Sequence, residues 1–185
     1  MNQWIKNILQ SKHRVALPIM THPGIEEIGK RVIDAVTDGT THYQAIKALA
    51  EKYETGACTV IMDLTVEAEA FGCKIGFPEE EVPNVISRLV HDADSVNALA
   101  IPDLTQGRLP EYLKANRLAV ANITDRPVLA GCIGPYSLAG RLYDMSEIMV
   151  AIYIEPDVIH TLLKKCTAFI LEYCRELKKI GVNGV

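Results

Sequence analysis

The sequence has little excess charge of either sign, no closely paired cysteines and no long apolar run. Its 185 residues carry 19 lysines and arginines against 23 aspartates and glutamates, a net charge of -4. That balance indicates no basic surface for nucleic acid. No run of about 18 apolar residues occurs, and the first residues lack a charged segment followed by an apolar core. We therefore expect a cytoplasmic protein with no membrane and no nucleic-acid partner.

The five cysteines, at positions 58, 73, 132, 166 and 174, include no Cys-x-x-Cys pair. Structural zinc sites depend on closely spaced ligands of that kind, so the cysteines alone predict no metal site. Cys58, Cys132 and Cys166 lie at apolar positions of expected strands or helices. This pattern favours reduced thiols that mostly fill the core, as in a reducing compartment.

Strand and helix patterns alternate along the chain, which is long enough for one domain with a sizeable core. Apolar, often β-branched runs predict parallel strands at 14–20, 58–62 and 128–133, with a fourth beginning at 182–185 and a short β segment at 73–77. Helical spacing predicts helices over 3–12, 23–36, 42–53, 135–152 and 157–180. Residues 82–90, 92–98 and 103–114 have weaker patterns, which fit helical or extended pieces. About four β/α units are half of an eight-stranded barrel of roughly 250 residues. We expect an α/β fold, the N-terminal half of a (β/α)8 TIM barrel.

Asp63 is the first residue that the pattern marks as functional. It ends the apolar run 58–62, and α/β folds bind ligands at the carboxyl ends of parallel strands. Glu67 and Glu69 follow within one helical turn or a short loop. Two simpler interpretations stay open: Asp63 caps the following turn, and the two glutamates lie on a solvated helix face.

Three segments together resemble the uroporphyrinogen decarboxylase superfamily. They are 18–24 (Pro-Ile-Met-Thr-His-Pro-Gly), 62–73 (Met-Asp-Leu-Thr-Val-Glu-Ala-Glu-Ala-Phe-Gly-Cys) and 131–140 (Gly-Cys-Ile-Gly-Pro-Tyr-Ser-Leu-Ala-Gly). Within the superfamily they are most similar to the methylcobamide:coenzyme M methyltransferase branch. The resemblance runs along essentially all of the chain and implies that residues 1–185 are a partial barrel, about half of a family member.

The resemblance separates two activities by the loop after the first strand. Decarboxylases of the family carry an arginine-rich loop there for the acidic side chains of the porphyrinogen, whereas residues 21–24 offer no arginine. Unpaired carboxylates are costly to bury, so an eight-carboxylate substrate needs such cations. The family's catalytic aspartate aligns with Asp63, but its tyrosine after the third strand falls near Arg141 rather than on Tyr143. Uroporphyrinogen decarboxylation, a step of porphyrin biosynthesis, is therefore the alternative, and a non-catalytic corrinoid-binding module is a third.

The leading hypothesis is methyl transfer from a methylated corrinoid protein to a small thiol such as coenzyme M. The resemblance implies a zinc ion that activates the thiol and methylcobamide as the methyl donor. The family's ligands, a His-x-Cys pair and a further Cys, belong to the C-terminal half, so we expect no metal ligand here and an inactive fragment. The resemblance implies the following roles: catalytic, Asp63; substrate-binding, His22, Glu67, Tyr136, Ser137 and Arg141.

Simpler structural roles remain open for two of these positions, and for the nearby Tyr143. His22 precedes Pro23 and is equally explained as a surface residue at a helix start. Ser137 follows Pro135 and Tyr136 and is equally explained as a helix N-cap rather than a ligand contact. Tyr143, near the mouth of the third strand, is equally explained by helix packing.

Overall fold

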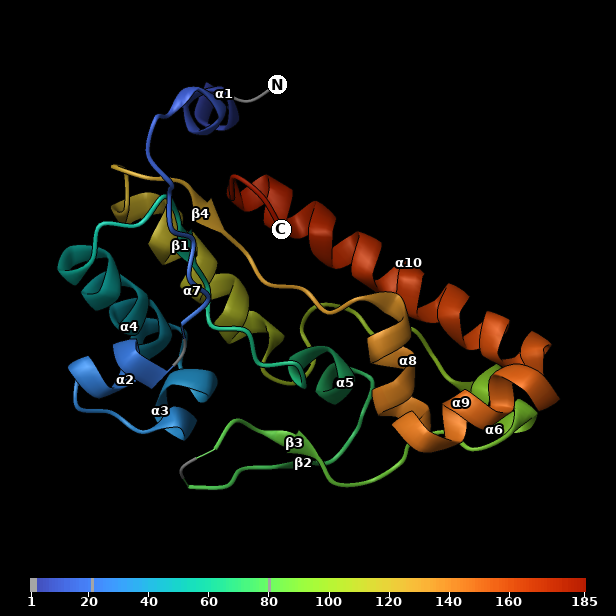
Figure 1. Cartoon of the computed structure of the whole chain (residues 1–185). Helices are drawn as coiled ribbons and strands as arrows, with labels where there is room; N and C mark the ends of the chain where they lie inside the picture. Colours follow the sequence, from blue (N-terminus) through green and yellow to red (C-terminus); the bar gives the residue numbers. More distant parts are fainter. Residues whose placement is uncertain (1–2, 21, 80) are drawn as a thin grey trace.

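A small parallel sheet lies between the helices in the computed structural model, which describes residues 3–20, 22–79 and 81–185 (Figure 1). Thr21 of the first motif lies outside the described residues. β1 (Cys58–Thr59) pairs in parallel with β4 (Val128–Leu129), and Gly184 forms a parallel bridge to Leu129. The predicted strands 58–62 and 128–133 are thus regular strands only over their first two residues. The bridge at Gly184 lies in the segment predicted to begin a fourth strand.

Residues 14–20 do not form a strand, so that prediction was wrong. The segment runs beside β1, where the carbonyl of Ala16 accepts a hydrogen bond from Gly56 N (2.9 Å). The carbonyl of Pro18 accepts a second from Thr59 Oγ1 (3.4 Å). Pro18 has no N–H to donate, which prevents a regular ladder at this point. The segment lies along one edge of β1 without continuous pairing.

Helices pack in two groups around the sheet (Figure 1). The first group is α2 (His22–Glu27), α3 (Val32–Thr37), α4 (Gly39–Lys52) and α7 (Leu109–Asn122). The second is α6 (Ala93–Ala98), α8 (Pro135–Tyr143), α9 (Met145–Ile154) and α10 (Pro156–Ile180). The short helix α5 (Val66–Ala70) contacts α7 and α8 and so joins the groups. A hairpin of β2 (Ile75–Gly76) and β3 (Asn84–Val85) confirms the β segment expected at 73–77.

Two predicted helices are each divided by a residue with positive φ. Gly29 (φ 63°) separates α2 from α3, where one helix over 23–36 was predicted. Asp144 (φ 90°) separates α8 from α9, where one helix over 135–152 was predicted. Glycine adopts this conformation at no steric cost. Asp144 gains hydrogen bonds to its Oδ1 from Ser146 N (2.8 Å) and Glu147 N (3.2 Å), which cap α9.

The remaining helices match the predictions with shifted ends. α4 begins at Gly39 rather than 42, because Asp38 Oδ2 accepts a hydrogen bond from Thr41 N (2.8 Å) and caps the helix. α7 spans Leu109–Asn122 and so begins within, and extends beyond, the piece at 103–114 that was expected to be helical or extended. α10 agrees within one residue, and Gly181 (φ 95°) ends it in the left-handed conformation. Among the described residues, no helix has both the length and the apolar character needed to cross a bilayer.

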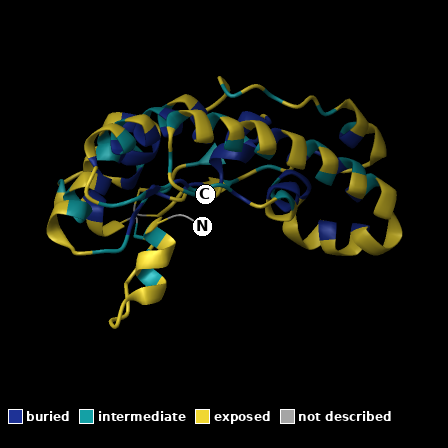
Figure 2. Ribbon diagram, turned by 90° about the horizontal axis from the view of Figure 1, so that it is seen from above, coloured by how far each residue is buried: buried dark blue, intermediate teal, exposed yellow. Residues whose placement is uncertain are grey.

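The first helix, α1 (Gln3–Gln10), lies at the amino-terminal end of the sheet. The indole Nε1 of Trp4 donates a hydrogen bond to the carbonyl of Gly56 (2.8 Å), just before β1. No residue of α1 is buried, and Figure 2 shows this helix projecting from the body with most of its surface exposed. α1 is therefore attached at the end of the sheet opposite to the carboxyl ends of β1 and β4.

Candidate active site

Two adjoining cavities lie where the chain leaves β1 and β4. The larger has a volume of about 410 Å³ and is lined by Met62, Leu64, Cys132, Ile133, Gly134, Ser137, Arg141 and Met145. The smaller, of about 10 Å³, shares Met62, Leu64, Cys132 and Ile133 with it and is also lined by Asp63, Val66, Glu67, Tyr112 and Gly131. We name the larger one the strand-end pocket. Its position at the carboxyl ends of parallel strands is where α/β folds bind ligands.

Asp63 is buried in a hydrogen-bonded network centred on Arg108. Arg108 pairs with Asp63 through Nη1, donates from Nη2 to Thr65 Oγ1 (2.9 Å) and donates from Nε to Glu69 Oε2 (2.6 Å). Tyr112 Oη donates to Asp63 Oδ2 (3.1 Å). The side chain of Asp63 is 0% exposed and that of Arg108 is 8% exposed. The sequence predicted neither Arg108 nor Tyr112 at this site.

The second oxygen of Asp63 holds the turn that leads into α5. Thr65 donates to Asp63 Oδ1 from its backbone N (3.0 Å) and from Oγ1 (2.6 Å). The simpler interpretation, that Asp63 caps the turn, is therefore confirmed. Asp63 lines the small cavity and is absent from the lining of the strand-end pocket. Its catalytic role stays a prediction.

Glu67 is buried in the lining of the small cavity that adjoins the strand-end pocket. It is 2% exposed, and its Oε1 accepts a hydrogen bond from Ile133 N (3.0 Å) at the end of the β4 segment. Burial raises the pKa of Glu67 to about 7, although the Ile133 N–H opposes this shift. The interpretation of Glu67 as part of a solvated helix face was wrong. Glu69 faces Arg108 instead of the cavity, with a side chain 22% exposed.

His42 of α4 is a further buried polar residue that the sequence analysis did not select. Its Nε2 accepts a hydrogen bond from Ile61 N (2.9 Å), and its ring meets Tyr112 edge-on at 4.9 Å between centroids. Burial lowers the pKa of His42 to about 3, so the imidazole is neutral and Nδ1 carries the hydrogen. His42 lies four residues before Ile46, which is on the apolar face of the predicted helix, and this spacing could have indicated that His42 is buried.

The predicted substrate-binding residues divide between the cavities and the surface. Ser137 and Arg141 line the strand-end pocket and Glu67 lines the small cavity that adjoins it. His22 is exposed at the first residue of α2, and Tyr136 is 37% exposed near the start of α8. The structure describes neither of these two in the lining of the two cavities. The sequence pattern therefore brings three of the five to the strand ends.

Ser137 and Tyr143 are distinguished by their local contacts. Gly134 is the N-cap of α8, so the interpretation of Ser137 as an N-cap was wrong. Tyr143 is buried, its Oη donates to His91 O (3.2 Å), and its ring packs under the guanidinium of Arg88 at 4.8 Å. Helix packing therefore accounts for Tyr143, as one of the two sequence interpretations stated.

Arg141 supplies the positive charge of the strand-end pocket. Its Nε is buried and has no hydrogen-bond partner in the part of the chain that the structure describes, and none of the ion pairs there includes it. Ser137 lies four residues earlier on the same face of α8, whose amino-terminal end faces the pocket at Gly134. The other lining residues, apart from Cys132, are apolar or glycine. Such a pocket suits a small molecule with one anionic group.

The residues present do not by themselves fit a zinc ion. Among the described residues, no group of three His, Cys, Asp or Glu side chains lies close enough to hold a metal. The Cys132 thiol donates a hydrogen bond to the carbonyl of Ile133 (3.5 Å), and burial raises the pKa of Cys132, which disfavours the thiolate that zinc requires. The zinc expected from the resemblance is therefore not supported by a ligand set within these residues.

Comparisons with known proteins find relatives in both branches of one family. The chain is 28% identical over 131 residues to methylcobamide:CoM methyltransferase MtbA of Methanosarcina mazei, covering 70% of this chain and 38% of that protein. It is also 28% identical over 141 residues to uroporphyrinogen decarboxylase of Tolumonas auensis, covering 72% of this chain and 39% of that protein. The chain therefore spans about two fifths of the length of these curated relatives.

A solved structure and a family match agree with those relatives. A methyltransferase from Methanosarcina mazei superimposes with a TM-score of 0.79 and 22% identity, covering 86% of this chain and 48% of that one. At that identity the likeness shows the fold alone. Residues 14–185 match the family described as Uroporphyrinogen decarboxylase (URO-D). The family expected from the three motifs is confirmed: the chain belongs to the uroporphyrinogen decarboxylase family.

Proposed function

We propose that this chain is the first half of a (β/α)8 barrel and forms part of the acceptor site of a corrinoid-dependent methyltransferase. The observation that carries the proposal is the strand-end pocket with Arg141, whose buried Nε has no hydrogen-bond partner among the described residues. The methyl donor would be methylcobamide on a corrinoid protein, and the acceptor a small thiol such as coenzyme M. The rest of the barrel and the zinc ligands would come from a segment outside residues 1–185.

The charge of the pocket favours this activity over decarboxylation of a porphyrinogen. Arg141 is the charged residue among those described in the lining, while Arg108 is engaged by Asp63 and Glu69. A porphyrinogen with eight carboxylates needs several cationic partners, because buried unpaired carboxylates are very costly. Coenzyme M carries one sulfonate on a short thiol. One arginine beside an apolar wall matches that chemistry.

In this proposal Glu67 takes the proton of the acceptor thiol. In methyl transfer the sulfur forms a bond to the methyl carbon as the cobalt–carbon bond breaks, with its electron pair left on cobalt. The thiol proton must leave, and Glu67 lines the small cavity, which shares four lining residues with the strand-end pocket. The volume of that cavity, about 10 Å³, is close to the smallest that holds a water. A carboxyl with a pKa of about 7 exchanges protons readily at neutral pH.

Asp63 has a different role in this proposal. Its carboxylate is held by Arg108, Tyr112 and Thr65, and it fixes the turn from which α5 and Glu67 begin. We therefore assign Asp63 as a positioning residue rather than the group that meets the substrate. His22 and Tyr136, exposed near the starts of α2 and α8, are available to the other half of the barrel.

Methyl transfer by the intact protein that contains residues 1–185 tests the proposal directly. With zinc, methylcobalamin and coenzyme M, we expect loss of the methylcobalamin absorbance and formation of the methylated thiol. Uroporphyrinogen should yield no coproporphyrinogen. Formation of coproporphyrinogen without methyl transfer would establish decarboxylation instead. Binding of a corrinoid protein without any methyl transfer would favour the non-catalytic module.

Replacing Arg141 by glutamine should weaken coenzyme M binding about tenfold to a hundredfold, the usual effect of losing a charged hydrogen-bond partner. Isothermal titration of the intact protein measures the change. Arg117→Gln is the matched control, because Arg117 is an exposed arginine of α7 paired with Glu176. Binding of 2-mercaptoethanol, which lacks the sulfonate, should be insensitive to Arg141→Gln. Equal losses for both thiols would contradict the assignment.

A further inference from the structure

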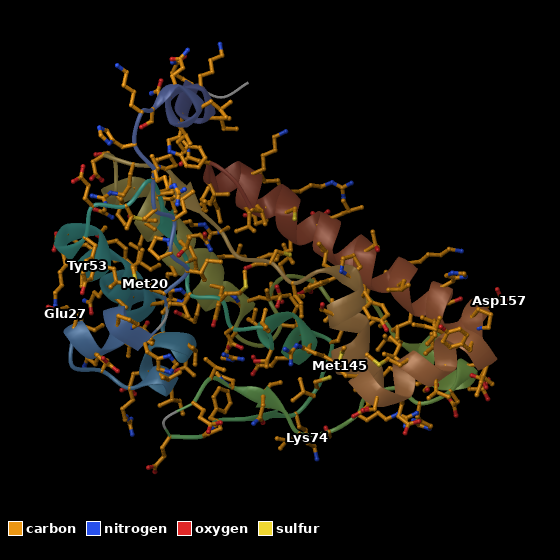
Figure 3. The ribbon with its side chains drawn as sticks, viewed as in Figure 1. Met20, Glu27, Tyr53, Lys74, Met145 and Asp157 are labelled. Atoms are coloured by element: carbon orange, nitrogen blue, oxygen red, sulfur yellow. The ribbon has the colours of Figure 1, made fainter. Side chains whose placement is uncertain are left out.

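A second pocket lies on the other side of Arg141. It has a volume of about 250 Å³ and is lined by Val85, Ile86, Ser87, Arg88, Gly140, Arg141, Asp144 and Met145. We name it the hairpin pocket, because Val85 ends β3 and the next three lining residues follow it directly. Arg141 and Met145 line both pockets and so form the wall between them. Figure 3 shows Met145 at the junction of α8 and α9, with Lys74 near the start of the hairpin.

Arg88 is held in place by contacts that leave part of its guanidinium free. Its Nε donates to Val90 O (2.9 Å) and its Nη2 donates to His91 O (3.0 Å). The same guanidinium lies over the Tyr143 ring, 4.8 Å from the centroid. Nη1 has no hydrogen bond among the described residues, and arginine has five N–H donors in a rigid plane. The orientation of Arg88 is therefore set before any ligand binds.

The lining of the hairpin pocket carries net positive charge. Neither Arg88 nor Arg141 belongs to an ion pair among the residues that the structure describes, and Arg141 Nε is buried without a partner. The opposing carboxylate is Asp144, whose Oδ1 already accepts the hydrogen bonds that cap α9. Two unpaired guanidinium groups on one cavity match the planar, multidentate recognition of oxyanions.

We propose that the hairpin pocket is a second anion site, which binds a phosphate or carboxylate group of a small ligand through Arg88 and Arg141. This site lies entirely within residues 85–145 and stands independently of methyl transfer. Since Arg141 lines both pockets, an anion in one should weaken binding of an anion in the other. By thermodynamic reciprocity, phosphate and coenzyme M should reduce each other's affinity by the same factor.

Titration of the intact protein that contains residues 1–185 with inorganic phosphate and, separately, with acetate tests the site and identifies the preferred group. At constant ionic strength we expect saturable binding, weakened about tenfold or more by Arg88→Gln. Ile86→Glu should have a similar effect, because it places a negative charge in the lining at a side chain 63% exposed, where the fold tolerates it. Val82→Glu is the matched control: it lies in the same hairpin, is 43% exposed and is outside the pocket lining.

The outcomes separate this site from the proposed function. Absence of binding by both anions, or binding unchanged in Arg88→Gln and Ile86→Glu, overturns the proposal. Phosphate binding lost in Arg141→Gln but retained in Arg88→Gln also overturns it, because the anion would then occupy the strand-end pocket. Phosphate binding that depends on Arg88, in a protein without methyl transfer, would support this site while removing the proposed function.

Discussion

Replacing Arg108 by methionine is expected to lower the free energy of unfolding by about 3–5 kcal/mol, the usual cost of breaking a buried ion pair from one side. Arg108 is the cationic partner of Asp63, whose side chain is 0% exposed, and of Glu69. Methionine preserves much of the volume but leaves the Asp63 carboxylate buried without its cation. Equilibrium denaturation in urea, followed by circular dichroism, measures the change.

Arg117→Met provides the control on the same helix. Its side chain is 54% exposed and pairs with Glu176 at the surface, where such pairs contribute about 0–1 kcal/mol. Adding Asp63→Asn to Arg108→Met removes the uncompensated charge, so the double variant should be more stable than the sum of the two single losses implies. If Arg108→Met destabilises no more than Arg117→Met, the Asp63 network does not hold this part of the fold.

Asp63 illustrates what a sequence pattern reveals about this site. A carboxylate that ends a buried apolar run needs partners, and the pattern placed it correctly in the buried segment that follows β1. Its main partner, Arg108, lies 45 residues later, in a segment whose helical pattern is weak. No local periodicity reports which distant side chain meets a buried charge. The position was therefore predictable, but the pairing was not.

The same limit explains why some predicted helices and one predicted strand differ from those in the structure. Apolar spacing continues across Gly29 and Asp144 because the helices on both sides of each break pack on the same core, so periodicity alone merges them. A strand also needs a neighbour with a matching ladder. The segment 14–20 has the composition of a strand, yet it forms only isolated hydrogen bonds to residues beside β1. Whether residues 14–20 form a strand therefore depends on tertiary pairing rather than on composition.

Glu67→Gln is expected to stabilise the fold at pH 8 much more than at pH 5. Burial raises the pKa of Glu67 from 4.5 to about 7 in the folded state. Below pH 4.5 the carboxyl is protonated in both states and its contribution to stability is fully present. As the pH rises toward 7, the unfolded chain loses this proton first, so the folded protein loses stability. The full penalty is roughly 3 kcal/mol, reached above pH 7.

Neighbouring charges shift the pKa of Glu67 in opposite directions. Asp63 raises its pKa and Arg141 lowers it, while Cys132 and Tyr173 are the other titratable groups that interact with it. Glutamine keeps an acceptor for Ile133 N and removes the buried charge. The gain in unfolding free energy over the native protein should therefore grow by about 2–3 kcal/mol between pH 5 and pH 8. Glu172→Gln, on the exposed face of α10, should show no such growth.

The effect of Glu67→Gln on methyl transfer is the second half of this prediction. If Glu67 takes the thiol proton, the same variant should reduce methyl transfer by the intact protein about a hundredfold or more, the usual contribution of a general base. A substitution that stabilises the fold and removes activity identifies a residue kept for function at a cost in stability. A gain that shrinks as the pH rises would mean that the fold favours the ionised carboxylate. Glu67 would then be a structural anchor for Ile133 N, and the proton acceptor would lie elsewhere in the protein.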